Sequence, residues 1–158
     1  MKILKLLWTR PSQTLSKRWL NAIRVVSLLG FIDATYLTLE HFLGKIPTCF
    51  VVNGCERVLT SVYSQIFGVP LALFGSIFYL SILVLSFVYA EFKKEKFWIW
   101  LMLVSFVGFG ASTAFIYIQL FILRAFCFYC LVSAASSTTI FILVTMASLA
   151  THGKEKTK

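Results

Sequence analysis

Residues 69–90 read VPLALFGSIFYLSILVLSFVYA and contain no charged side chain. A helix of about 20 apolar residues is long enough to cross the hydrocarbon core of a bilayer. Because no water is available there to bind exposed backbone groups, an uninterrupted apolar run of this length must be helical. The stretch therefore predicts a membrane-spanning helix.

Three further apolar runs accompany it, at about 20–43, 97–123 and 127–150. The chain has 158 residues, of which 59% are hydrophobic and 13% are charged, whereas soluble domains average about 45–50% apolar and about 25% charged residues. We therefore expect an all-α integral membrane protein, with residues 1–158 forming a single domain built as a four-helix bundle. The first run is too long for a cleavable signal peptide, and no small-residue cleavage site follows it.

Positive charge gathers at one end of the predicted bundle. Twelve of the 15 Lys and Arg residues lie in the N-terminal arm and the start of the first run, in the segment 91–96, and in the tail after residue 150. Loops rich in Lys and Arg stay in the cytoplasm, so we expect both basic tails, 1–18 and 151–158, on the cytoplasmic side of the cell membrane. The net charge of +9 is then a topology signal and does not indicate nucleic-acid binding.

The predicted outer loop, residues 44–68, differs from the other connections, which are short. Pro47, Asn53 and Gly54 break regular structure in its first part. From Glu56 onward, apolar residues recur four positions apart with polar residues between them. This pattern predicts an extracytoplasmic amphipathic helix of about three turns, lying as a lid over the outer end of the bundle.

All four cysteines, Cys49, Cys55, Cys127 and Cys130, fall at the predicted outer end. Cys127 and Cys130 form a Cys-x-x-Cys pair at the start of the fourth run, where a helix N-terminus favours the reactive thiolate form. Disulfides persist outside the cytoplasm, and Cys49 and Cys55 lie in a loop where they can pair with each other and meet a soluble partner. The convergence of these cysteines on one surface predicts a redox centre.

Three other uses of the cysteines need weighing. Two structural disulfides would stabilise the outer end of the bundle. A purely structural disulfide does not, however, require a Cys-x-x-Cys pair at a helix N-terminus. Zinc sites usually space their ligands about two to four residues apart within each pair, and the loop pair exceeds this spacing, so no metal site is expected. Covalent haem attachment needs a His directly after the second cysteine, where this chain has Leu131.

Polar residues in the first run are also candidates for function. A carboxylate at the bilayer centre costs about 2.5–3.5 kcal/mol on insertion scales, so Asp33 is expected to face the bundle interior. Proton relay and a purely structural hydrogen bond to a neighbouring helix are both open for Asp33. Glu40 and His41 lie near the outer interface, where polar ends are normal, and His41 is a further candidate for proton transfer.

Together these features resemble the vitamin K epoxide reductase family, most closely its bacterial branch. Two loop cysteines six positions apart, Ser61 six residues after the second of them, a lid helix and a Cys-x-x-Cys at the outer end of the last helix occur in this order. DATYLTLEHF in the first run and FGVPLALFGSIFY entering the second add to the resemblance, which covers about residues 19–150.

The resemblance implies a thiol:quinone oxidoreductase that oxidises a thioredoxin-like (DsbA-type) partner and so drives disulfide formation in exported proteins. Cys49 would exchange with that partner, and Cys55 would pass the electrons to Cys127. Cys127 and Cys130 would form the redox centre, with Cys130 next to a quinone of the menaquinone or ubiquinone type. Ser61 would hydrogen-bond a carbonyl of the quinone.

Departures from the family pattern narrow this expectation. Vertebrate members resemble one another in an Asn near the start of the second helix and a Tyr four residues after the Cys-x-x-Cys, and here Leu71 and Ala134 stand at those positions. Plain quinone reduction is therefore expected over epoxide reduction. Many bacterial members carry a fused thioredoxin-like domain, whereas this sequence ends at Lys158, so the partner is expected to be a separate protein.

Two alternative functions stay open. One is a quinone or quinone-epoxide reductase for cofactor recycling, and the other is a non-catalytic four-helix scaffold with structural disulfides. A requirement for quinone would separate both enzymes from the scaffold. In either enzyme we expect a quinone pocket lined by aromatic residues of the bundle: Phe74, Phe78, Tyr117 and Phe128.

Overall fold

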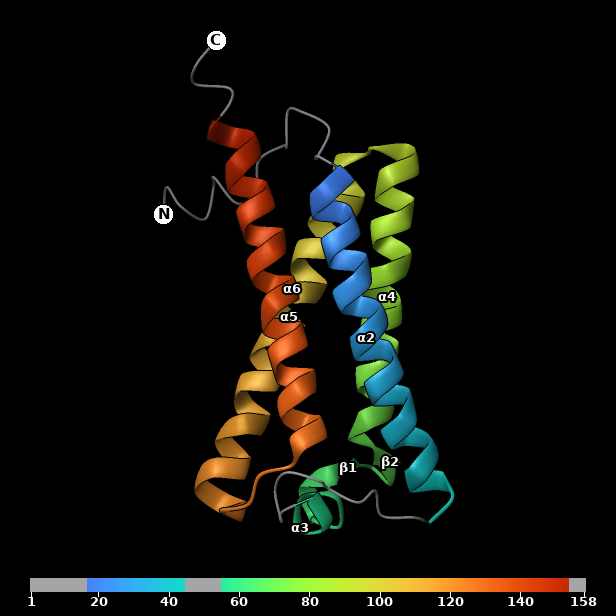
Figure 1. Cartoon of the computed structure of the whole chain (residues 1–158), viewed down its shortest axis with the longest axis vertical. Coiled ribbons are helices and arrows are strands. Elements are labelled where there is room, and N and C mark those ends of the chain that lie inside the picture. The colour runs from blue at the N-terminus through green and yellow to red at the C-terminus, as the bar shows by residue number, and fades with distance from the viewer. Residues whose placement is uncertain (1–16, 45–54, 154–158) are drawn as a thin grey trace.

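The computed structural model describes residues 17–44 and 55–153. Four long helices stand side by side in an elongated bundle (Figure 1). They are α2 (Lys17–Phe42), α4 (Leu71–Phe92), α5 (Glu95–Tyr117), which continues as the π-helical turn η2 (Ile118–Leu123), and α6 (Phe128–Gly153). Within the described residues, four helical spans are long and apolar enough to cross a membrane. The predicted all-α membrane bundle is therefore confirmed.

The helices pack in the ring order α2, α4, α5 and α6, and α6 closes the ring against α2. Their outward faces carry large apolar side chains, among which Leu29 is 60% exposed and Phe106 and Phe121 are each 62% exposed. Monomeric soluble proteins rarely show apolar patches as extended as this exterior. The outer surface of the bundle therefore fits a hydrocarbon environment.

The inner faces carry small residues, which allow the helix backbones to approach closely. Several buried serines satisfy their hydroxyls within their own helix, as Ser105 Oγ does by donating to Met102 O at 2.9 Å. Between α2 and α4, the ring of Tyr79 lies directly on Gly30, where an added Cβ would stand 2.4 Å from Tyr79 Cε1. The contact between these two helices thus depends on the absence of a side chain at Gly30.

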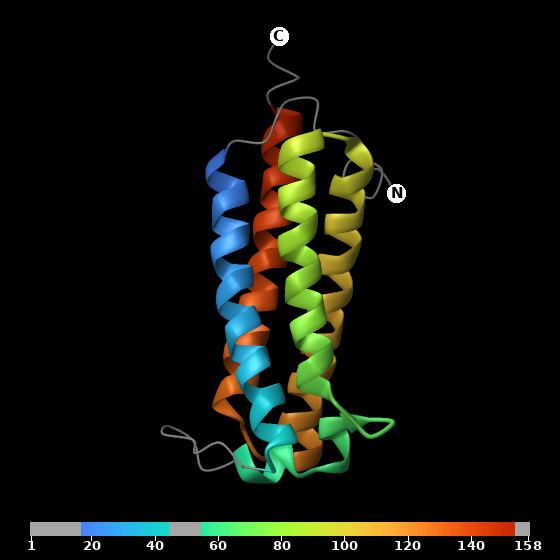
Figure 2. The ribbon, with the colours of Figure 1, turned by 90° about the vertical axis from the view of Figure 1, so that its right-hand side faces the viewer.

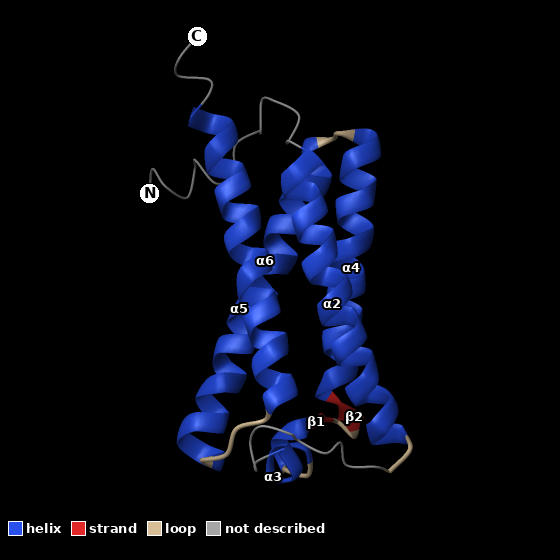
Figure 3. Ribbon diagram, viewed as in Figure 1, coloured by secondary structure: helices blue, strands red, loops and turns tan. Residues whose placement is uncertain are grey.

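The segment 55–70 covers one end of the bundle (Figure 3). It consists of α3 (Cys55–Leu59), the 3₁₀ turn η1 (Val62–Ser64) and the antiparallel strands β1 (Gln65–Ile66) and β2 (Val69–Pro70). Phe67 and Gly68 join the strands with φ values of 52° and 79°, and two consecutive residues with positive φ are what a type I′ hairpin turn requires. The hairpin projects sideways from the bundle (Figure 2).

The lid helix is shorter than its amphipathic pattern predicted. Helix α3 has 5 residues, and the backbone of Ser61 is already extended, with φ −70° and ψ 155°. The hydroxyl of Thr60 donates to Glu56 O at 2.7 Å, and that of Ser61 donates to Val58 O at 2.7 Å. Hydroxyl groups within the long helices make the same kind of bond, so these two bonds accompany the end of α3 without explaining it. The rest of the lid is a turn and a hairpin.

Candidate redox site

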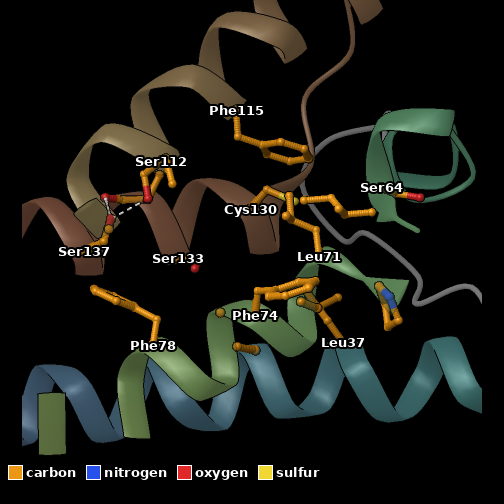
Figure 4. A pocket seen from close by; sticks show the side chains of 18 of the residues that line it. Leu37, Ser64, Leu71, Phe74, Phe78, Ser112, Phe115, Cys130, Ser133 and Ser137 are labelled. Atoms are coloured by element: carbon orange, nitrogen blue, oxygen red, sulfur yellow. Dashed lines mark hydrogen bonds between the residues drawn. The ribbon is translucent and has the colours of Figure 1, made fainter. Parts of the chain in front are cut away.

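A cavity of about 800 Å³ lies inside the bundle beneath the segment 55–70. All four long helices and this segment contribute to its wall (Figure 4). The lining is largely apolar and includes Leu37 of α2, Phe74 of α4 and Phe115 of α5. Small-molecule pockets are usually about 300–1,000 Å³ in volume, with apolar walls and a few polar groups. The cavity therefore has the size and chemistry of a site for a largely apolar molecule.

A small set of polar groups interrupts the apolar wall. Ser112 of α5 and Ser137 of α6 are joined by a hydrogen bond of 2.7 Å between their hydroxyls (Figure 4). The hydroxyl of Tyr79 donates to Ser133 O at 2.6 Å. Asp33 of α2 lines the same cavity, and its Oδ2 is buried without a hydrogen-bond partner among the described residues. Asp33 thus leaves an unsatisfied acceptor beside the cavity.

Asp33 belongs to a stripe of α2 that runs toward the covered end of the bundle. Asp33, Leu37 and His41 recur every four residues, and all three line the cavity, as positions on one helix face do. His41 Nε2 lies 3.4 Å from Nε2 of Gln65 in the lid. Glu40 is not part of the cavity wall. Of the polar residues singled out in this helix, Asp33 and His41 therefore face the cavity and Glu40 does not.

The Cys-x-x-Cys pair lies between the cavity and the covered end of the bundle. Cys130, in the first turn of α6, lines the cavity. Cys127 precedes α6, and its carbonyl accepts the N–H of Leu131 at 3.0 Å, so Cys127 is the N-cap residue of this helix. Both cysteines carry free thiols, and Cys127 is fully buried. The pair is therefore at a helix N-terminus, with Cys130 at the cavity.

The surroundings of Cys127 favour its thiolate. A hydrogen bond from the Cys130 thiol, together with the backbone N–H groups of Cys130 and Tyr129, lowers the pKa of Cys127 from 9.0 to about 7. Burial and the charge of Asp33 act in the opposite direction. Donors at a helix N-terminus stabilise a thiolate in this way. Of the two cysteines in this pair, Cys127 is consequently the better prepared for thiol–disulfide exchange.

Cys55 lies next to this pair, at the start of α3. Cys55 and Cys127 belong to one cluster of buried residues, and Cys130 packs against that cluster. Cys55 is disulfide-bonded. The remaining cysteine, Cys49, lies outside the described residues. Three of the four predicted redox cysteines are thus brought together, with Cys130 facing the cavity.

Ser61 is close to the cavity but is not part of its wall. Its hydroxyl is engaged with Val58 O at 2.7 Å. Ser64 lines the cavity instead, with its hydroxyl donating to Ser61 O at 2.7 Å. The predicted contact between Ser61 and a quinone stays a prediction.

The aromatic residues expected around the pocket divide into two groups. Phe74 and Phe78 of α4 line the cavity. Tyr117 and Phe128 do not, and for these two the expectation was wrong. Tyr117 is 58% exposed and packs on Phe121, with ring centroids 4.6 Å apart, and Phe128 is 40% exposed. Both rings face outward because of how each helix is rotated about its own axis. Hydropathy alone does not determine that rotation.

One residue of the site was missed by sequence reasoning. Gln119 lies in the π-helical turn η2 and is fully buried. Its Oε1 accepts the backbone N–H of Cys127 at 3.0 Å. Its backbone carbonyl accepts the N–H groups of Arg124 and, at 3.2 Å, of Ala125. The available signal was a lone amide in an apolar run, because a polar side chain at such a position needs partners.

Comparison with known proteins agrees with this arrangement. The model of the vitamin K epoxide reductase family matches residues 21–145, a range that includes all four cysteines. Thiol-disulfide oxidoreductase LTO1 of Arabidopsis thaliana is 36% identical over an alignment 121 residues long, which covers 71% of this chain. The match covers 32% of the plant protein, so the chain spans about a third of that relative's length. The chain belongs to the vitamin K epoxide reductase family.

Proposed function

We propose that the chain is a thiol:quinone oxidoreductase that takes two electrons from a dithiol partner and delivers them to a membrane quinone. The observation that carries this proposal is the position of the cysteines. Cys130 opens on the cavity, while its neighbour Cys127 belongs to the same buried cluster as Cys55. Membership of the family and the name of the plant relative support thiol–disulfide chemistry.

The thiol exchange proceeds through two mixed disulfides. The partner's dithiol reduces the disulfide of Cys49 and Cys55 and leaves with its own disulfide. The Cys55 thiolate then attacks Cys127 in the Cys127–Cys130 disulfide, and Cys130 departs as a thiolate. Attack of Cys49 on Cys55 restores the first disulfide and releases Cys127. Two electrons have then moved to the Cys127–Cys130 pair, beside the cavity.

The cavity fits a quinone of the menaquinone or ubiquinone type. Phe74, Phe78 and Phe115 would hold an apolar ring, and the Ser112–Ser137 pair offers hydroxyl groups to its oxygens. A bound quinone supplies a two-electron, two-proton acceptor of higher potential than a dithiol. The apolar exterior of the bundle suits an acceptor that is dissolved in the bilayer.

Plain quinone reduction is favoured over epoxide reduction by two residues of the cavity wall. Leu71 and Ala134 both line the cavity, and they stand where vertebrate members carry Asn and Tyr. Neither side chain can donate or accept a hydrogen bond. This wall therefore offers no polar group to an epoxide oxygen at those two positions.

Asp33 is proposed as the group that takes up and passes on protons at the cavity. Oxidation of two thiols releases two protons, and reduction of a quinone consumes two. Asp33 lines the cavity with Cys130 and has a buried oxygen free of other hydrogen bonds among the described residues. A purely structural carboxyl group would be expected to have both oxygens satisfied, which favours the relay over a structural role.

The family and the charge pattern support a proposal for the partner and the membrane location. We propose a separate thioredoxin-like, DsbA-type protein that exchanges with Cys49. The lid residues Glu56, Arg57 and Thr60 are exposed beside Cys55 and are available to such a protein. We place the chain in the cell membrane with its cysteines on the extracytoplasmic face.

A thiol count tests the proposed function. The protein is purified in detergent, fully reduced and freed of reductant, and its thiols are counted by maleimide mass shift after a quinone is added. We expect all four thiols to disappear only when quinone is present. In the Cys130→Ala variant the quinone-dependent loss is abolished, although Cys49 and Cys55 still accept electrons from a dithiol. Thiols that stay free, or close equally fast without quinone, would identify a structural scaffold.

A further inference from the structure

Gln119 has one half of its side-chain amide satisfied and the other half unused. Oε1 accepts the N–H of Cys127 at 3.0 Å. Nε2 is buried and has no hydrogen-bond partner among the described residues. The orientation of the amide follows from this network, because the N–H of Cys127 requires an acceptor and only the carbonyl end can provide one. A donor is therefore fixed beside the N-cap residue of α6.

An unsatisfied donor at this position is costly. Burying a polar group without a partner costs about 1–3 kcal/mol of stability. An apolar side chain would avoid that cost. A buried donor of this kind is explained when a partner arrives in another state of the protein.

The redox cysteines are the groups able to supply that partner. Gln119 does not line the cavity, so a molecule bound there is not its acceptor. The turn η2 packs against α3, the helix that begins with Cys55. Cys55 and Cys127 lie together in the buried cluster at this junction. A sulfur of this cluster that gains negative charge during exchange would provide an acceptor beside the Gln119 amide.

We propose that Gln119 is a positioning residue for electron transfer between the two cysteine pairs. Its Oε1 holds the backbone of Cys127, and its Nε2 donates a hydrogen bond to the sulfur of Cys127 when that sulfur is a thiolate. The inference rests on the proposed function, because it concerns the exchange of Cys55 with Cys127.

The step that benefits is the breakdown of the Cys55–Cys127 mixed disulfide. The Cys49 thiolate attacks the sulfur of Cys55, a new Cys49–Cys55 bond forms, and Cys127 leaves with the electron pair of the broken bond. A leaving thiol of lower pKa departs faster, and a charge-assisted hydrogen bond stabilises the departing thiolate. No other oxidant or reductant is needed for this step.

Other ionisable groups also act on Cys127 and remain unchanged in the test. They are Cys130 and Tyr129 on α6, Asp33 on α2 and Cys55 on α3. Because the variants leave these groups in place, a shift in the titration of Cys127 reports the amide of Gln119.

The experiment follows the alkylation of Cys127 by iodoacetamide in the reduced full-length protein, across a pH series centred near neutrality. The rate at the Cys127 peptide is read by mass spectrometry in the wild type, Gln119→Met and Gln119→Glu. Gln119→Met removes the donor and the acceptor at similar volume. Gln119→Glu keeps the acceptor for the N–H of Cys127 and replaces the donor. Asn21→Asp, the same chemical change at an exposed position of α2, is the control.

We expect the wild type to titrate below the ordinary range of a cysteine thiol, a direction that the Cys130 thiol and the backbone donors already favour. Below the wild-type midpoint, Gln119→Met should be alkylated roughly tenfold more slowly, as expected for one lost charge-assisted hydrogen bond. In Gln119→Glu the new carboxyl group and the Cys127 thiol lie in contact, so they lose their protons one after the other. The midpoint of the alkylation curve should therefore shift to higher pH, or the curve should split into two steps. Asn21→Asp should match the wild type.

A single unshifted curve in Gln119→Glu overturns the proposal, because a carboxyl group next to the sulfur, protonated or not, would disturb the titration. If the midpoint shifts in Gln119→Met but not in Gln119→Glu, the contact between Oε1 and the N–H of Cys127 accounts for the whole effect. That result also overturns the role of Nε2. Thermal unfolding of each variant identifies loss of fold. Alkylation requires neither quinone nor partner protein, so its outcome is separable from the failure of the proposed function.

Discussion

Asp33 and Gln119 each bury one polar atom without a hydrogen-bond partner among the described residues, Oδ2 in the first and Nε2 in the second. The two atoms serve different parts of the site. Asp33 faces the cavity with Cys130, whereas Gln119 is turned away from the cavity and holds Cys127. An unsatisfied acceptor suits a group that receives protons, and an unsatisfied donor suits a group that stabilises a thiolate. Proton transfer and thiol exchange are therefore assigned to separate residues.

Asp33→Asn should slow quinone consumption by about a hundredfold, the lower range for loss of a general acid or base. The substitution preserves the shape of the side chain but removes its ability to exchange a proton. Reduction of the disulfide of Cys55 by dithiothreitol should be unaffected, because that step does not use the cavity. The measurement is the rate of quinone reduction as a function of pH, with dithiothreitol as the electron donor.

Glu40→Gln is the matched control for this prediction. It makes the same change on the same helix, at a carboxyl group that is not part of the cavity wall. We expect the control to retain the wild-type rate and pH profile. Should Asp33→Asn behave in the same way as the control, Asp33 is a structural residue and another group carries the protons.

At the scale of elements, the contact between α2 and α4 depends on one glycine and one tyrosine, Gly30 and Tyr79. Tyr79 is 1% exposed, its ring lies on Gly30, and its hydroxyl reaches across to Ser133 O of α6 at 2.6 Å. One side chain thereby joins three helices and forms part of the cavity wall.

Gly30→Ala should destabilise the protein by about 1–3 kcal/mol, the usual range for overpacking. The added Cβ would lie 2.4 Å from Tyr79 Cε1 and 2.5 Å from Cζ. The ring cannot retreat without giving up its hydrogen bond to Ser133. Unfolding in detergent micelles, followed by circular dichroism, measures the change.

Gly110→Ala in α5 provides the comparison, because nothing lies within 4 Å of its added Cβ. Alanine is the better helix former by about 1 kcal/mol, so this variant should be as stable as the wild type or slightly more so. Equal destabilisation of both variants would mean that loss of glycine, and not contact with Tyr79, is responsible.

The elements differ in how far the sequence determines them. The long helices were predictable because each requires only a sustained apolar run, and a bilayer permits no other backbone structure for such a run. The length of α3 was not predictable from periodicity, since the backbone becomes extended at Ser61 although the amphipathic pattern continues beyond it. The π-helical turn that carries Gln119 changes only the backbone register and leaves no mark in hydropathy.

For the whole molecule, the positions of Cys55, Cys127 and Cys130 were easier to predict than the lining of the cavity. The positions of Cys127 and Cys130 follow directly from the start of the last apolar run, and that of Cys55 follows from its connection between two runs. Lining residues depend on the rotation of each helix about its axis. Phe78 faces inward and Tyr117 faces outward, although both are aromatic residues of spanning helices.

The charge pattern makes a prediction that concerns the molecule as a whole. The connection at Lys93 and Lys94 and the segment 55–70 lie at opposite ends of the bundle (Figure 1). Loops rich in Lys and Arg are retained in the cytoplasm, so the α4–α5 connection should be inside and the lid outside. Two reporter cysteines test this, each in a background whose four native cysteines are replaced by alanine. They are Arg57→Cys in the lid and Lys94→Cys in the connection, both at exposed positions.

A membrane-impermeant maleimide added to intact cells should label Arg57→Cys and leave Lys94→Cys unlabelled. Permeabilising the membrane should then expose both positions equally, which shows that both reporters are reactive. The reverse pattern in intact cells would place the lid in the cytoplasm, where glutathione keeps thiols reduced and disulfides rarely persist. The relay from Cys55 to Cys130 would then have no exported dithiol to oxidise. The side of the membrane on which Arg57→Cys reacts therefore decides which proteins the cysteine relay is able to serve.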